Sequence, residues 1–224
     1  MKENKLLRGL CVLTAALMLG LTGCANGSDT NGSDAQSQAA TAEVQSAWTE
    51  LDQTTITKEM GMGWNLGNQL EASNAGIPSE TAWGNPTISE DLIKAVKEQG
   101  FKTVRIPVSY LDKIGAAPDY TIDSAWLDRV QEVVDYVVGN DLYAIINIHG
   151  DGYYTVDHSW LRCVDDNQDE IKDKYEKVWA QIADRFKDYD QHLIFESMNE
   201  EFDNTYGKPN ATGYENINAY NQIF

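Results

Sequence analysis

The sequence predicts an α/β fold in which parallel strands alternate with covering helices. Two observations support this prediction. Short apolar runs of strand length recur along the chain, and longer segments with helical spacing of their apolar residues lie between them. Polar residues also gather at the ends of the apolar runs. Because strands that alternate with helices pair in parallel, these units predict a parallel sheet covered by helices.

The predicted strands are mostly continuous apolar runs, as expected for parallel strands that are buried on both faces. The first run is interrupted by glycines, which indicates that other backbone approaches it closely. The second run has Pro107 near its end. The predicted strands cover residues 61–67, 102–108, 142–148 and 192–198.

Apolar stripes and end signals identify the predicted helices. Thr87 and Glu90 have the spacing of a capping box, and Gly100 ends the helix that follows them. Trp126 and Trp179 lie on later helices, where a place in the core is the simpler interpretation. These later helices are predicted over residues 123–139, 169–186 and 214–224.

The polar residues at the strand ends decide between two architectures. A doubly wound sheet and a TIM barrel both fit the alternation, but the glycines near the first strand lack the spacing of a phosphate-binding loop. In a TIM barrel the carboxyl ends of the strands form the catalytic face. We therefore expect a (β/α)8 TIM barrel, with about its first four β/α units in this chain. The polar residues are Asn65, Asn68, Arg105, Asn147, His149, Asn199 and Glu200.

The start of the chain is predicted to be a targeting segment that is not part of the fold. Basic residues precede an apolar stretch that is short for a bilayer span, so residues 1–23 are typical of a signal peptide. The stretch ends Leu-Thr-Gly-Cys24, which resembles a bacterial lipobox and predicts lipidation of Cys24. An ordinary signal with an incidental cysteine is the alternative. Residues 24–46 are expected to be a flexible tether and 47–224 the folded domain, held outside the cytoplasm at a cell surface or secreted.

The charge balance excludes several partner classes. The chain has 17 Lys and Arg against 35 Asp and Glu, a net charge of −18. Phosphate backbones would repel such a chain, so no nucleic acid partner is predicted, and contact with a membrane is expected only through the lipid anchor. A neutral small molecule or polymer is the natural substrate class. The three histidines lack ligand spacing, so neither a metal nor another cofactor is predicted.

Three strand-end residues have side chains suited to chemistry. A partly desolvated carboxyl at Glu200 would have a raised pKa and donate a proton to a leaving oxygen, although an ordinary solvated glutamate fits equally well. Arg105 lies within an apolar run and needs a carboxylate or several carbonyls to offset its desolvation, whether for a catalytic or a structural pair. A neutral His149 would bond a sugar hydroxyl, or be a satisfied structural histidine.

Aromatic residues are abundant outside the helical stripes. Exposed rings in a groove stack on the C–H faces of pyranoses, so each such ring is either a sugar contact or a packing residue. The candidate rings are Trp64, Trp83, Tyr153, Tyr154 and Trp160.

Five sequence blocks follow one another along the predicted strands and loops. They are Gly63-Trp-Asn-Leu-Gly-Asn68, Glu80-Thr-Ala-Trp-Gly-Asn-Pro86, Gly100-Phe-Lys-Thr-Val-Arg-Ile-Pro-Val108, Ala144-Ile-Ile-Asn-Ile-His149 and Phe195-Glu-Ser-Met-Asn-Glu200. Together and in this order, the blocks resemble glycoside hydrolase family 5, the cellulase family. Two of them, Trp-Asn-Leu-Gly-Asn and Thr-Ala-Trp-Gly-Asn-Pro, resemble its subfamily four of endoglucanases, xyloglucanases and lichenases.

The resemblance implies a (β/α)8 barrel and a retaining mechanism on a β-1,4-linked glucan such as cellulose, mixed-linkage glucan or xyloglucan. By this likeness Glu200 is the general acid/base and Asn199 bonds the sugar 2-hydroxyl. Arg105 orients the nucleophile, and His149 lines the same subsite. The predicted substrate contacts are Asn65, Asn68, Trp83, Tyr153, Tyr154 and Trp160.

This chain departs from the family pattern in two places. His149 is followed by Gly150, where members of the subgroup often have a second histidine. No acid in the chain matches the family's nucleophile, a glutamate at the end of strand seven. We therefore expect an N-terminal part of an endo-β-1,4-glucanase that is inactive by itself. The alternative hypothesis is a non-catalytic glycan-binding surface lipoprotein on a degenerate barrel.

Overall fold

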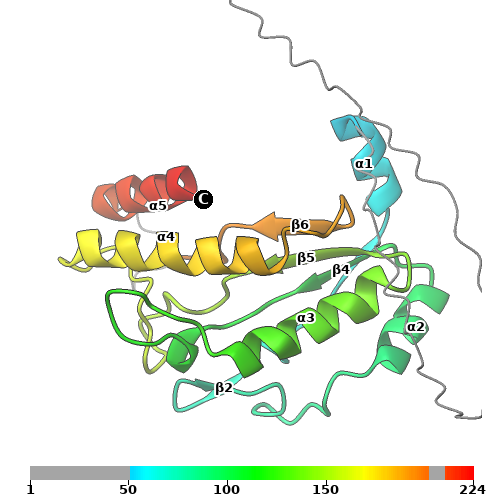
Figure 1. The fold of residues 1–224 in the computed structure, drawn as a ribbon, viewed down its shortest axis with the longest axis horizontal. Coiled ribbons are helices and arrows are strands. Elements are labelled where there is room, and N and C mark those ends of the chain that lie inside the picture. Colours follow the sequence, from blue (N-terminus) through cyan, green and yellow to red (C-terminus); the bar gives the residue numbers. More distant parts are fainter. Residues whose placement is uncertain (1–50, 202–209) are drawn as a thin grey trace, which may run out of the picture. The chain divides into compact units, whose positions relative to one another are not determined.

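A four-stranded parallel sheet with helices beside it forms the centre of the folded domain (Figure 1). The computed structural model describes residues 51–201 and 210–224. The predicted signal peptide, the lipidation site Cys24 and the predicted tether lie outside these residues.

The strands are added to the sheet in chain order. Strands β1 (Gly63–Asn65), β4 (Thr103–Ile106), β5 (Tyr143–Asn147) and β6 (Leu193–Glu196) are neighbours in the order β1-β4-β5-β6, and every pair is parallel. Each lies within a predicted strand but is shorter. Because all four run the same way, their carboxyl ends meet at one edge of the sheet, which brings the polar strand-end residues together.

Helices follow the strands and run alongside the sheet (Figure 1). The helices after the first two strands, α2 (Glu90–Glu98) and α3 (Ser124–Val138), pack on each other. The next two, α4 (Gln168–Arg185) and α5 (Ala211–Ile223), form a second contacting pair. The predicted alternation is therefore confirmed, with boundaries that differ by one to three residues.

The start of α2 corrects one prediction. The helix is capped by Ser89, whose Oγ accepts from the backbone N–H of Leu92 at 3.3 Å, rather than by Thr87. Ser89 has extended backbone, as an N-cap requires, and Glu90 is the first helical residue instead of the third. The capping-box spacing was thus present without a capping box. At the start of α3, Asp123 is the cap, as its predicted position implies.

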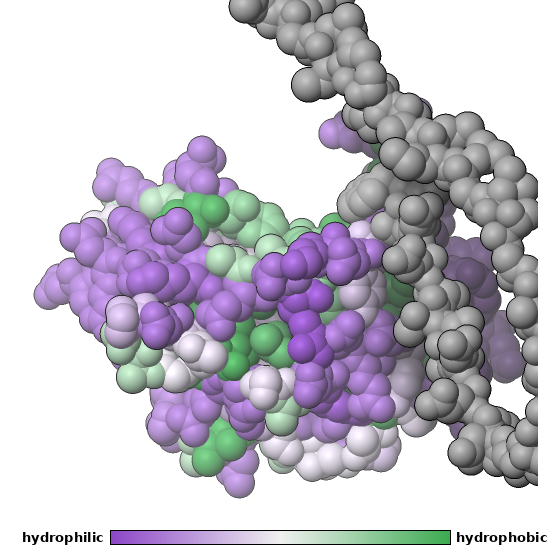
Figure 2. Space-filling view, viewed as in Figure 1, coloured by the Kyte–Doolittle hydropathy of each residue, from purple (hydrophilic) through white to green (hydrophobic). Residues whose placement is uncertain are grey.

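The core lies between the sheet and the helices. Strand side chains such as Val104, Ile106 and Ile146 are almost completely buried, and α3 contributes a stripe of valines. Trp126 and Trp179 are also buried, which confirms that they are core residues. The face shown in Figure 2 is mainly hydrophilic, with smaller apolar areas.

Four short elements carry no clear sequence signal. Helix α1 (Gln53–Met60) buries none of its residues, and the two-residue strands β2 (Ser73–Asn74) and β3 (Ile77–Pro78) pair antiparallel. A 3-10 turn, η1 (Leu111–Lys113), follows β4. Among the described helices, none has both the length and the apolar character for crossing a membrane.

The cap at Ser89 gives a direct test of this fold. Ser89→Ala leaves an N–H of the first turn without its side-chain acceptor, so we expect the free energy of unfolding to fall by about 1 kcal/mol. Thr87→Ala, two residues earlier and exposed, is the matched control and should change it by less than about 0.5 kcal/mol. Chemical denaturation of both variants measures the difference. A larger loss of unfolding free energy for Thr87→Ala would instead identify Thr87 as the N-cap of a capping box.

Candidate active site

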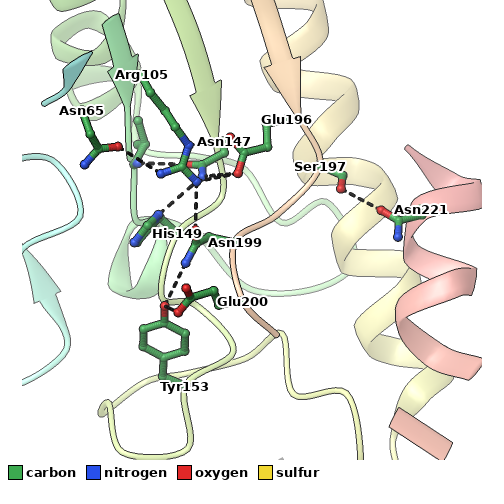
Figure 3. Close-up of polar contacts among 11 residues, drawn as sticks. Asn65, Arg105, Asn147, His149, Tyr153, Glu196, Ser197, Asn199, Glu200 and Asn221 are labelled. Carbon is green, nitrogen blue, oxygen red and sulfur yellow. Dashed lines mark hydrogen bonds and ion pairs between the residues drawn. The ribbon is translucent and has the colours of Figure 1, made fainter. Parts of the chain in front are cut away.

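Arg105 is the centre of the polar cluster at the carboxyl edge of the sheet (Figure 3). Its Nε donates to Glu196 Oε2 at 2.6 Å, and one terminal nitrogen donates to Glu196 Oε1 at 2.5 Å. That nitrogen also donates to Asn199 Oδ1 at 2.8 Å, while the other donates to Asn65 Oδ1 at 3.1 Å. From its place on β4, the guanidinium thus joins groups that end or follow two other strands, β1 and β6.

Glu196 is the carboxylate that offsets the charge of Arg105. Burial raises the pKa of Glu196, but the hydrogen bonds from Arg105 and from Asn147 Nδ2 outweigh this effect and hold it below the ordinary value. The bond to Glu196 in turn raises the pKa of Arg105. Both side chains are therefore charged at neutral pH, and they form a partly buried ion pair whose side chains are 25% and 32% exposed.

Asn199 and Glu200 follow β6 in an irregular segment. The N–H of Asn199 donates to the carbonyl of Ile148 at 2.9 Å, so this segment stays paired to the chain that follows β5. Asn199 Nδ2 donates to the Tyr153 hydroxyl at 2.9 Å, and that hydroxyl lies 3.4 Å from Glu200 Oε2. Glu200 is exposed and has a left-handed backbone with φ of 40°, which is uncommon for a residue with a side chain.

His149 lies beside this network as a neutral imidazole. Burial and the nearby Arg105 lower its pKa to about 4, and the charge of Glu196 only partly opposes them. Its Nδ1 is 3.4 Å from Asn147 Nδ2. At neutral pH the ring therefore has one donor and one acceptor for a ligand hydroxyl or a neighbouring group.

An open cavity of about 250 Å³ lies next to His149 and Tyr153. It is bordered by loops that follow β1, β4 and β5, and its lining mixes polar groups with apolar surface. The lining residues are Asn68, Glu71, Ser73, Trp83, Ser109, Leu111, His149, Gly150, Tyr153 and Val156.

Trp83 presents a ring to this cavity. Its side chain is 55% exposed, yet its Nε1 donates to the carbonyl of Ser73 at 2.9 Å. The bond fixes one edge of the indole and leaves a face accessible, which is the geometry needed to stack on a sugar. Asn68 is held nearby, since its carbonyl accepts from Asn85 Nδ2 at 2.8 Å and its N–H donates to Glu71.

The buried carboxylate of Asp151 holds two of the loops around the cavity. It accepts from Ser109 Oγ at 2.8 Å, from the N–H of Tyr110 at 3.1 Å and from Trp160 Nε1 at 2.8 Å. Burial raises its pKa to about 6. Burial, with the nearby Asp151, also raises the pKa of Glu201 well above its ordinary value.

The structure brings some predicted contacts to the cavity and leaves others elsewhere. Trp160 borders a separate hollow, and the Lys174 amine lies 4.5 Å from the centre of its ring. The Tyr154 hydroxyl donates to Asp165 at 2.9 Å. Trp64 is on β1 and packs against the core. Position outside a helical stripe therefore did not reveal which way these rings point.

Three residues of the site received little weight in the sequence. Glu196 lies inside the predicted strand 192–198 and has no predicted role of its own, and Asn147 is noted only as a strand-end residue. Glu71 has no motif of its own, but its Oε1 and Oε2 accept from the N–H groups of Asn68 and Gln69. Polar residues inside apolar strands were the signal for the first two. Within residues 51–201 and 210–224, no group of three or more His, Cys, Asp or Glu is placed to hold a metal ion.

Known proteins resemble this chain across the site. The family model for "Cellulase (glycosyl hydrolase family 5)" matches residues 67–224. Endoglucanase A of Paenibacillus barcinonensis is 57% identical over 187 residues, which are 84% of this chain and 46% of that protein. The chain thus spans less than half the length of this relative.

Solved structures agree with the sequence match. A family 5 xyloglucanase from Paenibacillus pabuli has a TM-score of 0.74 and 63% identity, covering 75% of this chain and 47% of its own. A GH5-4 broad specificity endoglucanase from Ruminococcus champanellensis, with bound cellotriose, has a TM-score of 0.71 and 42% identity, covering 80% and 53%. The chain therefore belongs to glycosyl hydrolase family 5, the cellulase family, and its parallel sheet is part of that family's (β/α)8 barrel.

Proposed function

We propose that the chain supplies the acid/base half of the active site of a retaining endo-β-1,4-glucanase. The observation that carries the proposal is the hydrogen-bonded path from Arg105 through Asn199 and Tyr153 to Glu200, beside an open cavity with an exposed tryptophan. The relatives named as endoglucanases support it. Because the chain spans less than half of its closely similar relative, the activity is proposed for the whole protein.

Glu200 is proposed as the general acid/base. In a retaining glycosidase one carboxyl protonates the leaving oxygen and then deprotonates the attacking water, while a second carboxylate about 5–5.5 Å away is the nucleophile. Glu200 is exposed at the mouth of the site and is approached by the Tyr153 hydroxyl. No acid of this chain matches the family's nucleophile, so we propose that this chain alone does not hydrolyse glucan.

The residues around Glu200 receive binding roles. The Oδ1 of Asn199 accepts a hydrogen bond from Arg105. We propose that its Nδ2 donates to the 2-hydroxyl of the sugar. His149 is proposed to bond another hydroxyl of that sugar, and Arg105 to orient the nucleophile. These contacts stabilise the transition state only if they strengthen as the sugar distorts.

The proposed substrate is a neutral β-linked glucan, with cellulose, mixed-linkage glucan and xyloglucan as candidates. The stacking face of Trp83 and the polar lining of the cavity support this class, as does the strongly acidic chain, which does not attract anionic polymers. We also propose, from the sequence pattern, that Cys24 is lipidated and that the protein acts outside the cytoplasm of a bacterium.

Glu200→Gln tests the acid/base role in the whole protein. On an unactivated β-glucan, we expect kcat/KM to fall by about 10²- to 10⁴-fold, because no proton reaches the leaving oxygen. On an aryl glycoside with a good leaving group, the first step should survive as a burst, and azide should speed turnover because it needs no general base. Reducing-sugar release and burst kinetics measure both effects.

The matched control for this variant is Glu215→Gln, which removes an exposed carboxylate from α5 that does not line the cavity. It should retain wild-type rates. Hydrolysis by Glu200→Gln at the wild-type rate would overturn the proposed role of Glu200. Binding of glucan without turnover by either protein would instead favour the glycan-binding hypothesis.

Trp83→Ala tests the stacking face. Loss of the ring removes a contact that we expect to be similar in the ground and transition states, so KM for a soluble glucan should rise about tenfold with kcat within twofold. Phe186→Leu is the comparison, since Phe186 is a buried core aromatic that does not line the cavity, and its loss should reduce stability without raising KM. Equal KM values for wild type and Trp83→Ala would exclude the contact.

The protonation state of His149 gives a pH test. With a pKa of about 4 in the folded protein and about 6.5 when unfolded, the unfolded state binds the proton first as the pH falls. The stability that this group contributes at neutral pH is therefore lost between about pH 6.5 and 4. The His149 ring resonances in NMR, assigned with His149→Gln, should stay constant from pH 7.5 to 5.5, and a midpoint near 6.5 would contradict the prediction.

A further inference from the structure

We propose that Glu196 is a positioning residue of the glucanase site, which acts through Arg105 to fix the orientation of Asn199. This inference rests on the proposed function. Glu196 is not among the proposed catalytic and binding residues, and within the described chain its carboxylate forms no hydrogen bond with a residue that lines the cavity. Its effect on the reaction must therefore pass through Arg105 and Asn147.

The ion pair fixes the plane of the guanidinium. Arg105 and Glu196 form a two-pronged contact, with Nε–Oε2 at 2.6 Å and a terminal nitrogen–Oε1 at 2.5 Å. Two parallel hydrogen bonds define a plane, which a single point contact cannot do. The pair also crosses β5, because β4 and β6 are not neighbours, and Asn147 of β5 donates to Glu196 Oε1 at 3.1 Å. Three strands therefore hold the plane.

The fixed guanidinium decides which way the Asn199 amide points. A terminal nitrogen of Arg105 donates to Asn199 Oδ1 at 2.8 Å, so the carbonyl oxygen of this amide is occupied. The Nδ2 group must then face the other way, where it donates to the Tyr153 hydroxyl at 2.9 Å. Asn199 thus offers a donor to the site rather than an acceptor. A guanidinium free to rotate would leave that choice open.

The carboxylate of Glu196 also affects the electrostatics of the groups around it. The titratable and charged groups that face the ion pair are His149 after β5, Tyr153 in the following loop, and Glu71 in the loop after β1. Glu196 opposes the effect of Arg105 on the His149 ring. Removing its charge while keeping its size would make the site more positive, so neighbouring acids would lose their protons at lower pH.

A second ion pair in the chain provides the matched control. Arg129 and Glu80 also form a two-pronged contact, at 2.9 and 3.0 Å, and their side chains are less exposed than those of Arg105 and Glu196. This pair joins α3 to the loop before α2, and neither residue lines the cavity. It therefore shows what the loss of a buried ion pair does to stability alone.

Glu196→Gln and Glu196→Asp in the whole protein test the proposal. For Glu196→Gln we expect kcat on a soluble glucan to fall about 10- to 100-fold, with KM within about twofold, because Asn199 loses its orientation. Both limbs of the pH profile of kcat/KM should move to lower pH. Glu196→Asp keeps the charge but shortens the reach, so kcat should fall while the limbs stay within about 0.3 pH units of the wild type. Glu80→Gln should lower the unfolding midpoint and leave kcat and both limbs unchanged.

The outcomes separate this inference from the proposed function. Glu196→Gln could lose stability as Glu80→Gln does while keeping the kcat and pH profile of the wild type. That result overturns the positioning role, even if Glu200→Gln is impaired. If Glu196→Gln does not fold, an unchanged kcat in Glu196→Asp overturns it equally. Full activity in Glu200→Gln would instead contradict the proposed function, independently of Glu196.

Discussion

The site depends on one constraint, the need to compensate a positive charge inside a parallel sheet. Arg105 lies on β4 among apolar neighbours, and an unpaired guanidinium there would cost several kcal/mol of stability. Glu196 removes that cost, and the remaining donors of Arg105 then reach Asn65 and Asn199. The arrangement that satisfies the charge is therefore the same one that assembles the polar end of the sheet.

Much of the fold could be predicted from the sequence, because strand and helix periods differ and the βα alternation is regular. The residue at which helix α2 starts was harder to predict. Thr87 and Ser89 are both hydroxyl residues followed closely by acids, and only the backbone conformation, extended at Ser89, selects between them. The short pair β2 and β3 has too few residues to show a period, and α1 buries no residue that would mark a stripe.

The site was predictable where a polar residue interrupts or ends an apolar strand, as at Arg105, His149 and Asn199. The partner of Arg105 was not, because it requires knowing that β4 and β6 lie on either side of β5. On a regular strand Glu196 and Glu200, four residues apart, would lie on the same side, but β6 ends at Glu196 and Glu200 has a left-handed backbone. Both reach the same network by different routes, Glu196 through Arg105 and Glu200 through Tyr153.

The ion pair also has a consequence for synthesis. Arg105 and Glu196 are separated by 91 positions, and the chain leaves the ribosome from its N-terminal end. A sheet made of β1, β4 and β5 alone would hold a charged guanidinium without its carboxylate, which disfavours early closure of those strands. Docking of β6 brings the missing charge and the Asn199–Glu200 segment together. The addition of β6 therefore compensates the charge of Arg105 and brings Asn199 and Glu200 to the edge of the sheet in a single event.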